Sequence, residues 1–171
     1  MNVVETTRTI VDYITLDDAP FFITLVNSLD WLRFIGDRNV SNVQDACQYL
    51  KDGFLKSYSD NGFGYYVVRT TLDCEPIGAC GFLKKSSLEN PDFGFAFLPA
   101  FYGKGFAIES CRAVLDFGIH SFDFNVLDAV TSPDNVKSIR LLDKLGFRLS
   151  GTVDGDPSEN QLMLYRWQQT E

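Results

Sequence analysis

The segment Tyr102–Ala107, with the sequence YGKGFA, constrains the fold of this chain more than any other part of it. It follows a run of strand-forming residues, Phe93–Leu98, and precedes a segment, Ile108–Ile119, with apolar residues at helical spacing. The N–H groups in the first turn of a helix have no partner within the helix, and the helix dipole is positive there. Glycines let the backbone approach a phosphate closely. The sequence therefore predicts an anion site, with a simple turn as the alternative because Gly-x-Gly is common.

Composition is typical of a single globular domain, which we expect to span residues 1–171. Hydrophobic residues make up 45% of the chain and charged residues 22%, as in soluble proteins. No apolar run approaches the roughly 18–20 residues of a membrane-spanning helix. The first residues include Glu5 and lack an apolar core, so no signal peptide is visible. We therefore expect a cytoplasmic protein that does not associate with membranes.

Three features of the composition argue against metal sites, Ser-His-Asp triads and nucleic-acid binding. They are the single histidine, the spacing of the cysteines and the net charge. His120 alone cannot supply a histidine metal site or a Ser-His-Asp triad elsewhere in the chain. The cysteines lack a Cys-x-x-Cys spacing and are expected to be buried, reduced thiols: Cys47, Cys74, Cys80 and Cys111. The formal net charge of −8 argues against nucleic-acid binding and favours cationic partners. An anionic ligand must then be held locally, by backbone amides and a few cations.

Predicted strands and helices follow an order that lacks the regular βαβ alternation of a Rossmann sheet. We expect strands at 9–14, 64–71, 76–84, 92–98, 127–131, 149–153 and 161–167. Capping-box patterns at Thr15 and Ser41 predict helices to about residues 29 and 58. Further helices are expected at 108–119 and from Ser132 to Leu145, with Gly146 as the stop. The pattern places helices among mostly antiparallel strands.

Five segments, in their order and spacing, resemble the GNAT superfamily of acyl-CoA N-acyltransferases over nearly the whole chain. The resemblance is greatest to the branch that acetylates the N-termini of ribosomal proteins, the RimJ/RimL type. Each segment alone is a weak signal, whereas the combination is specific. The segments are WLRFIGDR at 31–38, PIGACG at 76–81, DFGF at 92–95, YGKGFAIE at 102–109 and NVKSIRLLDKLGF at 135–147.

The resemblance implies a mixed α/β (α+β) fold with a central, mostly antiparallel, splayed sheet of about six to seven strands flanked by about four helices. It implies acetyl-CoA as the cosubstrate and no metal. The backbone of Phe95, Ala96 and Phe97 would pair with the pantetheine arm, which resembles a peptide and can extend a sheet edge. Asn135 would contact the ligand near its thioester, and Lys104 is the favoured partner of the 3′-phosphate. The pyrophosphate would bind the loop and helix start, formed by Gly103, Lys104, Gly105, Phe106, Ala107 and Ile108.

Two departures from the family pattern affect the expected chemistry. Tyr102 stands where Gln or Arg is usual, which should leave binding intact because the loop binds through backbone groups. Leu142 stands where many relatives have a Tyr as general acid, and leucine cannot donate a proton. Ser138, one turn earlier, is the expected substitute, with a helix-surface serine as an equal alternative. Asp92 matches the position of the general base in many relatives, and its alternative role is that of a turn residue.

The expected reaction is direct attack of a neutral amine on the thioester of acetyl-CoA. At pH 7, loss of the amine proton costs roughly 1 kcal/mol for an α-amine and roughly 4.6 kcal/mol for a lysine. A weak base such as Asp92 therefore favours an α-amine, for example the N-terminus of a basic protein. The substrate side is expected at Trp31, Arg33, Asp37 and Arg38, although Trp31 fits the core equally well.

Three alternatives remain open. The first is a non-catalytic acyl-CoA-binding module, which the missing tyrosine favours. The second is an acetyltransferase of a small amine or polyamine. The third is a nucleotide-binding protein, which ranks last because the chain has no Walker motif and no complete Gly-x-Gly-x-x-Gly pattern. The chain is expected to act as a monomer or homodimer.

Overall fold

The computed structural model describes residues 1–155 and 161–170, and its dominant feature is one twisted sheet. In the described residues the sheet has eight strands in the order β1-β2-β3-β4-β5-β6-β8-β7. The strands are β1 (Asn2–Glu5), β2 (Thr9–Tyr13), β3 (Tyr65–Thr70), β4 (Pro76–Leu83), β5 (Asp92–Phe97), β6 (Val126–Thr131), β7 (Arg148–Val153) and β8 (Leu162–Gln168). The helices are α1 (Ala19–Val26), α2 (Leu29–Phe34), α3 (Val43–Leu50), α4 (Lys56–Asn61), α5 (Phe106–Phe122) and α6 (Val136–Leu145).

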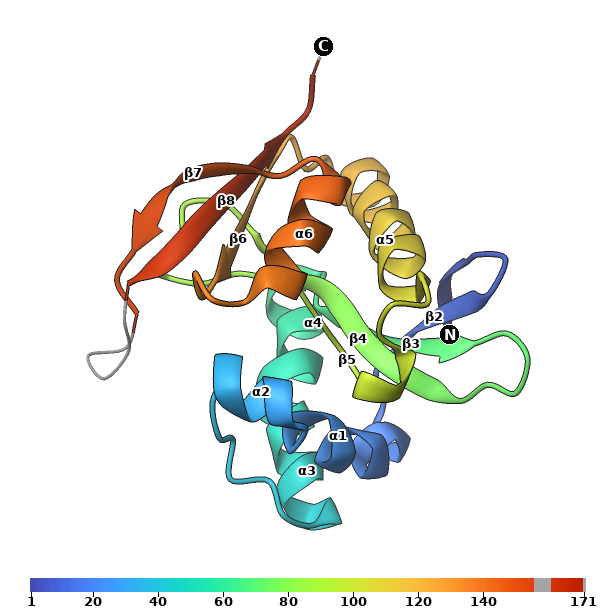
Figure 1. The fold of residues 1–171 in the computed structure, drawn as a ribbon. Helices are drawn as coiled ribbons and strands as arrows, with labels where there is room; N and C mark the ends of the chain where they lie inside the picture. Colours follow the sequence, from blue (N-terminus) through green and yellow to red (C-terminus); the bar gives the residue numbers. More distant parts are fainter. Residues whose placement is uncertain (156–160, 171) are drawn as a thin grey trace.

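The pairing between β5 and β6 is the irregular point of this sheet. All other neighbouring strands are antiparallel, whereas β5 and β6 run parallel. Among the described residues, Asp92 and Asp128 are the one pair of partners in register between these two strands. Beyond this point β5 and β6 separate, as Figure 1 shows where β5 passes below α6. The expected mostly antiparallel, splayed sheet is therefore confirmed.

Helices cover both faces of the sheet and enclose two separate hydrophobic cores (Figure 1). Strand side chains alternate between the faces, so neighbouring residues of β3 belong to different cores. Tyr66 and Val68 pack with residues of α5 and α6, whereas Val67 packs with α1 and α3. Both faces of the sheet are therefore covered by helices that pack against its buried side chains.

Several boundaries differ from the predicted ones. The capping box at Thr15 is present, but it opens a short 3-10 turn that precedes α1. The expected helix to about residue 29 ends at Val26, and α2, which begins at Leu29, was not predicted. The second capping residue is Asn42, whose side chain accepts from the Asp45 N–H, and not Ser41. A π-helical turn at Lys51–Leu55 separates α3 from α4. The sheet also exceeds the expected six to seven strands, because β1 was not predicted.

The cysteines only partly match the expectation of buried thiols. Cys80 and Cys111 are buried, Cys47 is half-buried and Cys74 is exposed, so the expectation is wrong for Cys74. Burial raises the pKa of the Cys111 thiol well above its ordinary value. Among the described residues, no helix has both the length and the apolar character needed to cross a membrane.

Candidate active site

A cleft of about 290 Å³ opens where β5 and β6 separate. Four parts of the chain line it: α2 with its flanking residues, the end of β5, the glycine loop before α5, and the first turns of α6. Predicted site residues that line it are Trp31, Phe95, Ala96, Phe97, Gly103, Gly105, Ala107, Ile108, Asn135 and Ser138. The fold thus brings together residues from distant parts of the sequence.

The edge of β5 offers unpaired backbone groups to this cleft. The Leu98 N–H donates to the Ile77 carbonyl on β4 at 2.9 Å, so the backbone of Leu98 faces β4. In an antiparallel strand successive residues face opposite neighbours. The backbone N–H and C=O of Phe95 and Phe97 therefore face away from β4, into the opening that β6 has left. A peptide-like chain can pair with these groups as an additional strand.

The glycine loop supplies a second set of donors. Gly103 and Gly105 have φ values of 70° and 83°, in the left-handed region that favours glycine. Gly105 is the N-cap of α5, and a glycine has no side chain to cover the first-turn N–H groups. The N–H groups of Phe106, Ala107 and Ile108 have no acceptor within the helix. These donors fit a pyrophosphate, which a helix start attracts.

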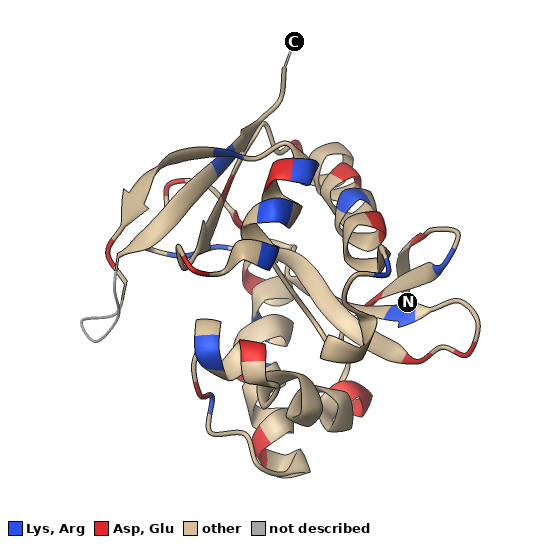
Figure 2. Cartoon of the chain, in the orientation of Figure 1, with Lys and Arg blue, Asp and Glu red and all other residues tan. Residues whose placement is uncertain are grey.

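Basic side chains line the cleft along α6. Lys137, Arg140 and Lys144 recur at three- and four-residue spacing and face the cleft together. Figure 2 shows basic positions in blue along α6. The glycine loop at the start of α5 lines the same cleft. In a chain with a net charge of −8, such a local cluster can hold an anionic ligand. The cluster fits the phosphates of acetyl-CoA.

Asn135 and Ser138 lie at the start of α6. The Asn135 side chain is the N-cap of this helix, because its Oδ1 accepts from the Ser138 N–H at 3.2 Å. Leu142, on the next turn, is 1% exposed and belongs to the core, so it takes no part in the cleft. Ser138 is therefore the hydroxyl of this helix that lines the cleft.

Asp92 lies at the separation point but does not line the cleft. Its side chain is 4% exposed and its Oδ2 forms an ion pair with Lys85 Nζ at 2.6 Å. Burial raises the pKa of Asp92 above its ordinary value, and Lys85 opposes this only in part. Its role as general base stays a prediction.

The remaining predicted residues fall outside the lining of the cleft. The Lys104 ammonium lies 5.8 Å from the centre of the Phe101 ring, and the Phe106 ring packs against Phe101. Arg33 pairs with Asp134 at 3.0 Å at the start of α6. On the substrate side, Asp37 accepts from the Asn39 N–H in a local turn, and Arg38 lies beside Tyr49 of α3.

Sequence reasoning missed the contacts that α2 makes across the cleft. Asp30 Oδ2 lies 3.3 Å from Lys137 Nζ, and the Lys137 ammonium lies 4.3 Å from the centre of the Tyr102 ring. Burial, together with the nearby Asp30, raises the pKa of Tyr102. Trp31 is 5% exposed, and within the described part of the chain its Nε1 has no hydrogen-bond partner. The WLRFIGDR segment indicated this region, but no local pattern identified Asp30.

The fold and the cleft define a transferase that uses an acyl-CoA. The model of a family described as an acetyltransferase (GNAT) domain matches residues 8–148. The chain therefore belongs to the GNAT acetyltransferase family, and it is an acetyl-CoA-dependent N-acetyltransferase. Among curated proteins it is similar to the uncharacterized N-acetyltransferase p20 of Bacillus licheniformis, with 34% identity over 117 residues. That match covers 67% of this chain and 63% of the relative.

Two solved structures have the same fold. The acetyltransferase from Agrobacterium tumefaciens str. C58 matches with a TM-score of 0.80 and 19% identity, over 97% of this chain and 94% of that one. RimL, a ribosomal L7/L12 alpha-N-protein acetyltransferase in complex with coenzyme A, matches with a TM-score of 0.78 and 16% identity. This second match covers 98% of each chain. These structures confirm the fold, and the match of the family model over residues 8–148 confirms the resemblance to the GNAT superfamily.

Proposed function

We propose that this enzyme transfers the acetyl group of acetyl-CoA to the α-amine of a protein or peptide N-terminus. One observation carries the proposal: a single cleft joins the β5 edge and the glycine loop to α2. The first two features fit the cosubstrate, and α2 bounds the space left for an amine. Acetyl-CoA supplies an activated thioester, and the residues of the chain orient the two reactants and stabilise the developing charge.

Each part of the cleft has a role in this proposal. The Phe97 N–H, on the free edge of β5, donates to the thioester oxygen as it gains charge. The start of α5 and the cations of α6 hold the phosphates. Ser138 donates a proton to the leaving thiolate.

Within the described part of the chain, no lining residue of the cleft carries an unpaired carboxylate, and this favours an α-amine over a lysine as the acceptor. Among the described lining residues the one carboxylate is Asp30, and it is paired with Lys137. Asp92 is buried against Lys85. With such weak base catalysis the amine must lose its proton cheaply, which costs roughly 1 kcal/mol at pH 7 for an α-amine but roughly 4.6 kcal/mol for a lysine. The shared fold with RimL, a ribosomal L7/L12 alpha-N-protein acetyltransferase, also supports an α-amine as the acceptor.

The test is a turnover assay that measures release of free CoA, with three kinds of acceptor. The first is a set of basic peptides with a free N-terminus and no lysine. The second has the same sequences with a blocked N-terminus and one lysine, and the third is spermidine. We expect turnover with the free N-termini and at least tenfold less with the other acceptors, and mass spectrometry places the acetyl group.

Other outcomes assign another function. Preferred turnover of spermidine indicates a polyamine acetyltransferase, which an acidic chain also suits. Binding of acetyl-CoA without turnover of any amine indicates a binding module.

The role of Ser138 is tested by Ser138→Ala, which should lower kcat by about 10–100-fold and leave the KM for acetyl-CoA unchanged.

A further inference from the structure

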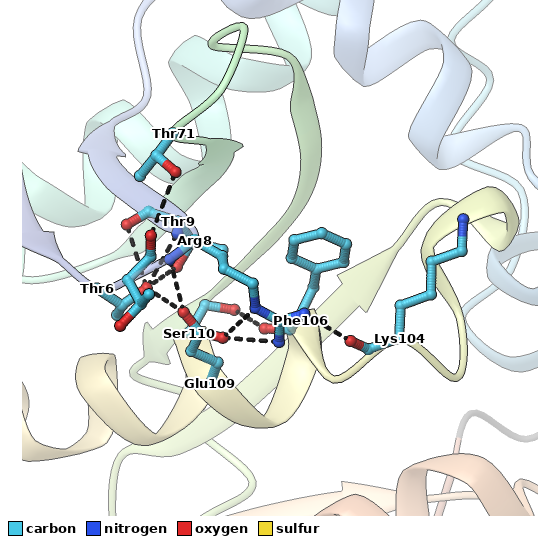
Figure 3. A network of polar contacts seen from close by, with 9 residues as sticks. Thr6, Arg8, Thr9, Thr71, Lys104, Phe106, Glu109 and Ser110 are labelled. Carbon is cyan, nitrogen blue, oxygen red and sulfur yellow. Dashed lines mark hydrogen bonds and ion pairs between the residues drawn. The ribbon is translucent and has the colours of Figure 1, made fainter.

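Arg8, in the turn between β1 and β2, reaches the glycine loop although 96 residues separate them (Figure 3). Its Nη1 donates to the Lys104 carbonyl at 2.9 Å. Its Nε donates to Glu109 Oε2 at 2.8 Å, and its backbone N–H donates to Glu109 Oε1 at 2.8 Å. Its guanidinium also lies 4.7 Å from the centre of the Phe106 ring. Arg8 thus contacts both the loop and the first turn of α5.

The bond to the Lys104 carbonyl fixes the orientation of a peptide group. In a trans peptide the C=O and the following N–H point in opposite directions. Because the Lys104 carbonyl points to Arg8, the N–H of Gly105 points away from Arg8. Figure 3 shows that the carbonyl of Lys104 faces Arg8 and that the Lys104 side chain extends elsewhere. Gly105 lines the cleft, so its N–H is available on that side.

Arg8 also balances the charge of Glu109. This carboxylate lies in the first turn of α5, close to the donors that fit a pyrophosphate. Burial opposes its ionisation, but hydrogen bonds from Thr6 and Arg8 outweigh burial and hold the pKa of Glu109 below its ordinary value. The carboxylate is therefore ionised at neutral pH, and the arginine 2.7 Å away reduces its repulsion of a bound phosphate.

We propose that Arg8 is a positioning residue for the phosphate-binding loop: through Lys104 and Glu109 it turns the backbone donors of the loop toward the pyrophosphate of acetyl-CoA. This role rests on the proposed use of the cleft by acetyl-CoA. Arg8 does not line the cleft, and its side chain is 45% exposed in a shallow depression that it shares with Arg112. It therefore acts through the loop and not by contact with a phosphate.

Two substrates, one with and one without the pyrophosphate and its nucleotide, distinguish positioning of the loop by Arg8 from a general effect of the substitution on folding. Acetyl-CoA carries the pyrophosphate, whereas S-acetylpantetheine lacks it and still binds the β5 edge. For Arg8→Ala we expect the Kd of CoA and the KM of acetyl-CoA to rise about tenfold, with kcat unchanged. Turnover of S-acetylpantetheine should equal that of the wild type. Arg112→Ala, which removes the same charge from the same depression, is the matched control and should leave both substrates unaffected.

Two further variants test whether Arg8 positions the backbone of the loop or acts only through its charge. Arg8→Lys keeps the charge but not the fork that bonds two partners at once, so CoA affinity should stay at least about threefold weaker than in the wild type. Glu109→Gln removes the charge that repels a bound phosphate but keeps an acceptor for Arg8. In this background Arg8→Ala should still weaken CoA binding, because the bond to the Lys104 carbonyl is lost. If Arg8 only balanced the charge of Glu109, Arg8→Ala would have no effect there.

The outcomes distinguish this proposal from the proposed function. Circular dichroism and melting curves check that each variant is folded, and Arg8→Lys remains available if Arg8→Ala does not fold. Unchanged CoA affinity in folded Arg8→Ala, an equal loss with S-acetylpantetheine, or no effect of Arg8→Ala in the Glu109→Gln background would overturn the role of Arg8 alone. A wild-type chain that binds no CoA would overturn the proposed function and the role of Arg8 with it.

Discussion

Single residues set the geometry of the glycine loop, and Gly105 is the most demanding of them. Its φ of 83° costs an L-residue about 1–2 kcal/mol. A Cβ at this position would lie 3.0 Å from Arg8 Nη2, so a side chain would press on Arg8. We expect Gly105→Ala to weaken CoA binding by about tenfold, because the loop shifts away from the cleft, and to lower the free energy of unfolding by about 1–2 kcal/mol. Calorimetry and urea denaturation measure the two effects.

Gly62 provides the matched control for this change. It ends α4 with a φ of 78°, and a Cβ there would meet nothing within 4 Å. Gly62→Ala should therefore lose a similar amount of stability while its affinity for CoA stays at the wild-type value. If both variants lose affinity equally, the effect comes from stability and the loop has no special role.

Substitution of Asp92 by asparagine is expected to raise the stability of the protein and to lower its turnover. Its pKa is raised in the folded state by burial. Its contribution to stability is thus present below the ordinary carboxyl pKa and is lost as the pH rises through the folded-state pKa. Above the ordinary carboxyl pKa the buried Asp92 side chain therefore lowers the free energy of unfolding. Asp92→Asn should raise the melting temperature at pH 7–8, and this gain should shrink as the pH falls toward about 4.

Turnover by the same variant tests the predicted general base. A base matters most when the amine is protonated, so the loss of kcat/KM should be larger at pH 7 than at pH 9. Lys85, whose side chain is 40% exposed, can remain solvated without its partner. A wild-type rate for Asp92→Asn at every pH would leave Asp92 with a structural role only.

At the scale of elements, two ion pairs connect α2 to the start of α6. These pairs, Asp30–Lys137 and Arg33–Asp134, join the amine side of the cleft to the helix that carries Ser138. Exposed pairs contribute about 0.2–1 kcal/mol, which corresponds to about 1.4–5-fold in affinity. Arg33 does not line the cleft, so Arg33→Asp should raise the KM for the acceptor within this range and leave the KM for acetyl-CoA unchanged. The effect should fall as salt increases.

A charge exchange controls for the substitution itself. The double variant Arg33→Asp/Asp134→Arg restores opposite charges and should recover most of the acceptor KM. Failure of the exchange to recover it, or an equal change for acetyl-CoA, would show that the pair does not hold α2 in place for the acceptor.

The elements that the sequence predicted well are those with local signals. The loop before α5 was found because its glycines and the following apolar spacing are adjacent in sequence. By contrast, β1 has four residues, mostly exposed or half-buried, and becomes a strand only by pairing with β2. The contacts of Arg8 with Glu109 span 101 residues, and Asp30 reaches Lys137 over 107, so no local pattern could reveal them. Residues that act through tertiary contacts were therefore missed.

In the whole molecule, the cleft lies between two parts of the sheet that separate beyond Asp92 and Asp128. A ligand in the cleft contacts β5 and the start of α5 on one side and α6 on the other, and so adds contacts across this separation. A ligand that binds only the folded state adds about 2.7 kcal/mol at a hundredfold excess over its Kd. For a chain of this length that corresponds to a rise in melting temperature of about 5–11 °C.

The location of the amides that the ligand protects tests the cleft more sharply than the melting temperature does. We expect acetyl-CoA to slow amide hydrogen exchange at Phe95 and Phe97, in the loop 103–108 and at the start of α6, because these backbone groups become bonded or covered. The exposed strand β7 is paired with β8, away from the lining of the cleft, and should exchange at the same rate with and without ligand. S-acetylpantetheine should protect Phe95 and Phe97 but not the loop, since it lacks the pyrophosphate. Protection of β7 equal to that of β5 would mean that the ligand stabilises the fold without occupying this cleft.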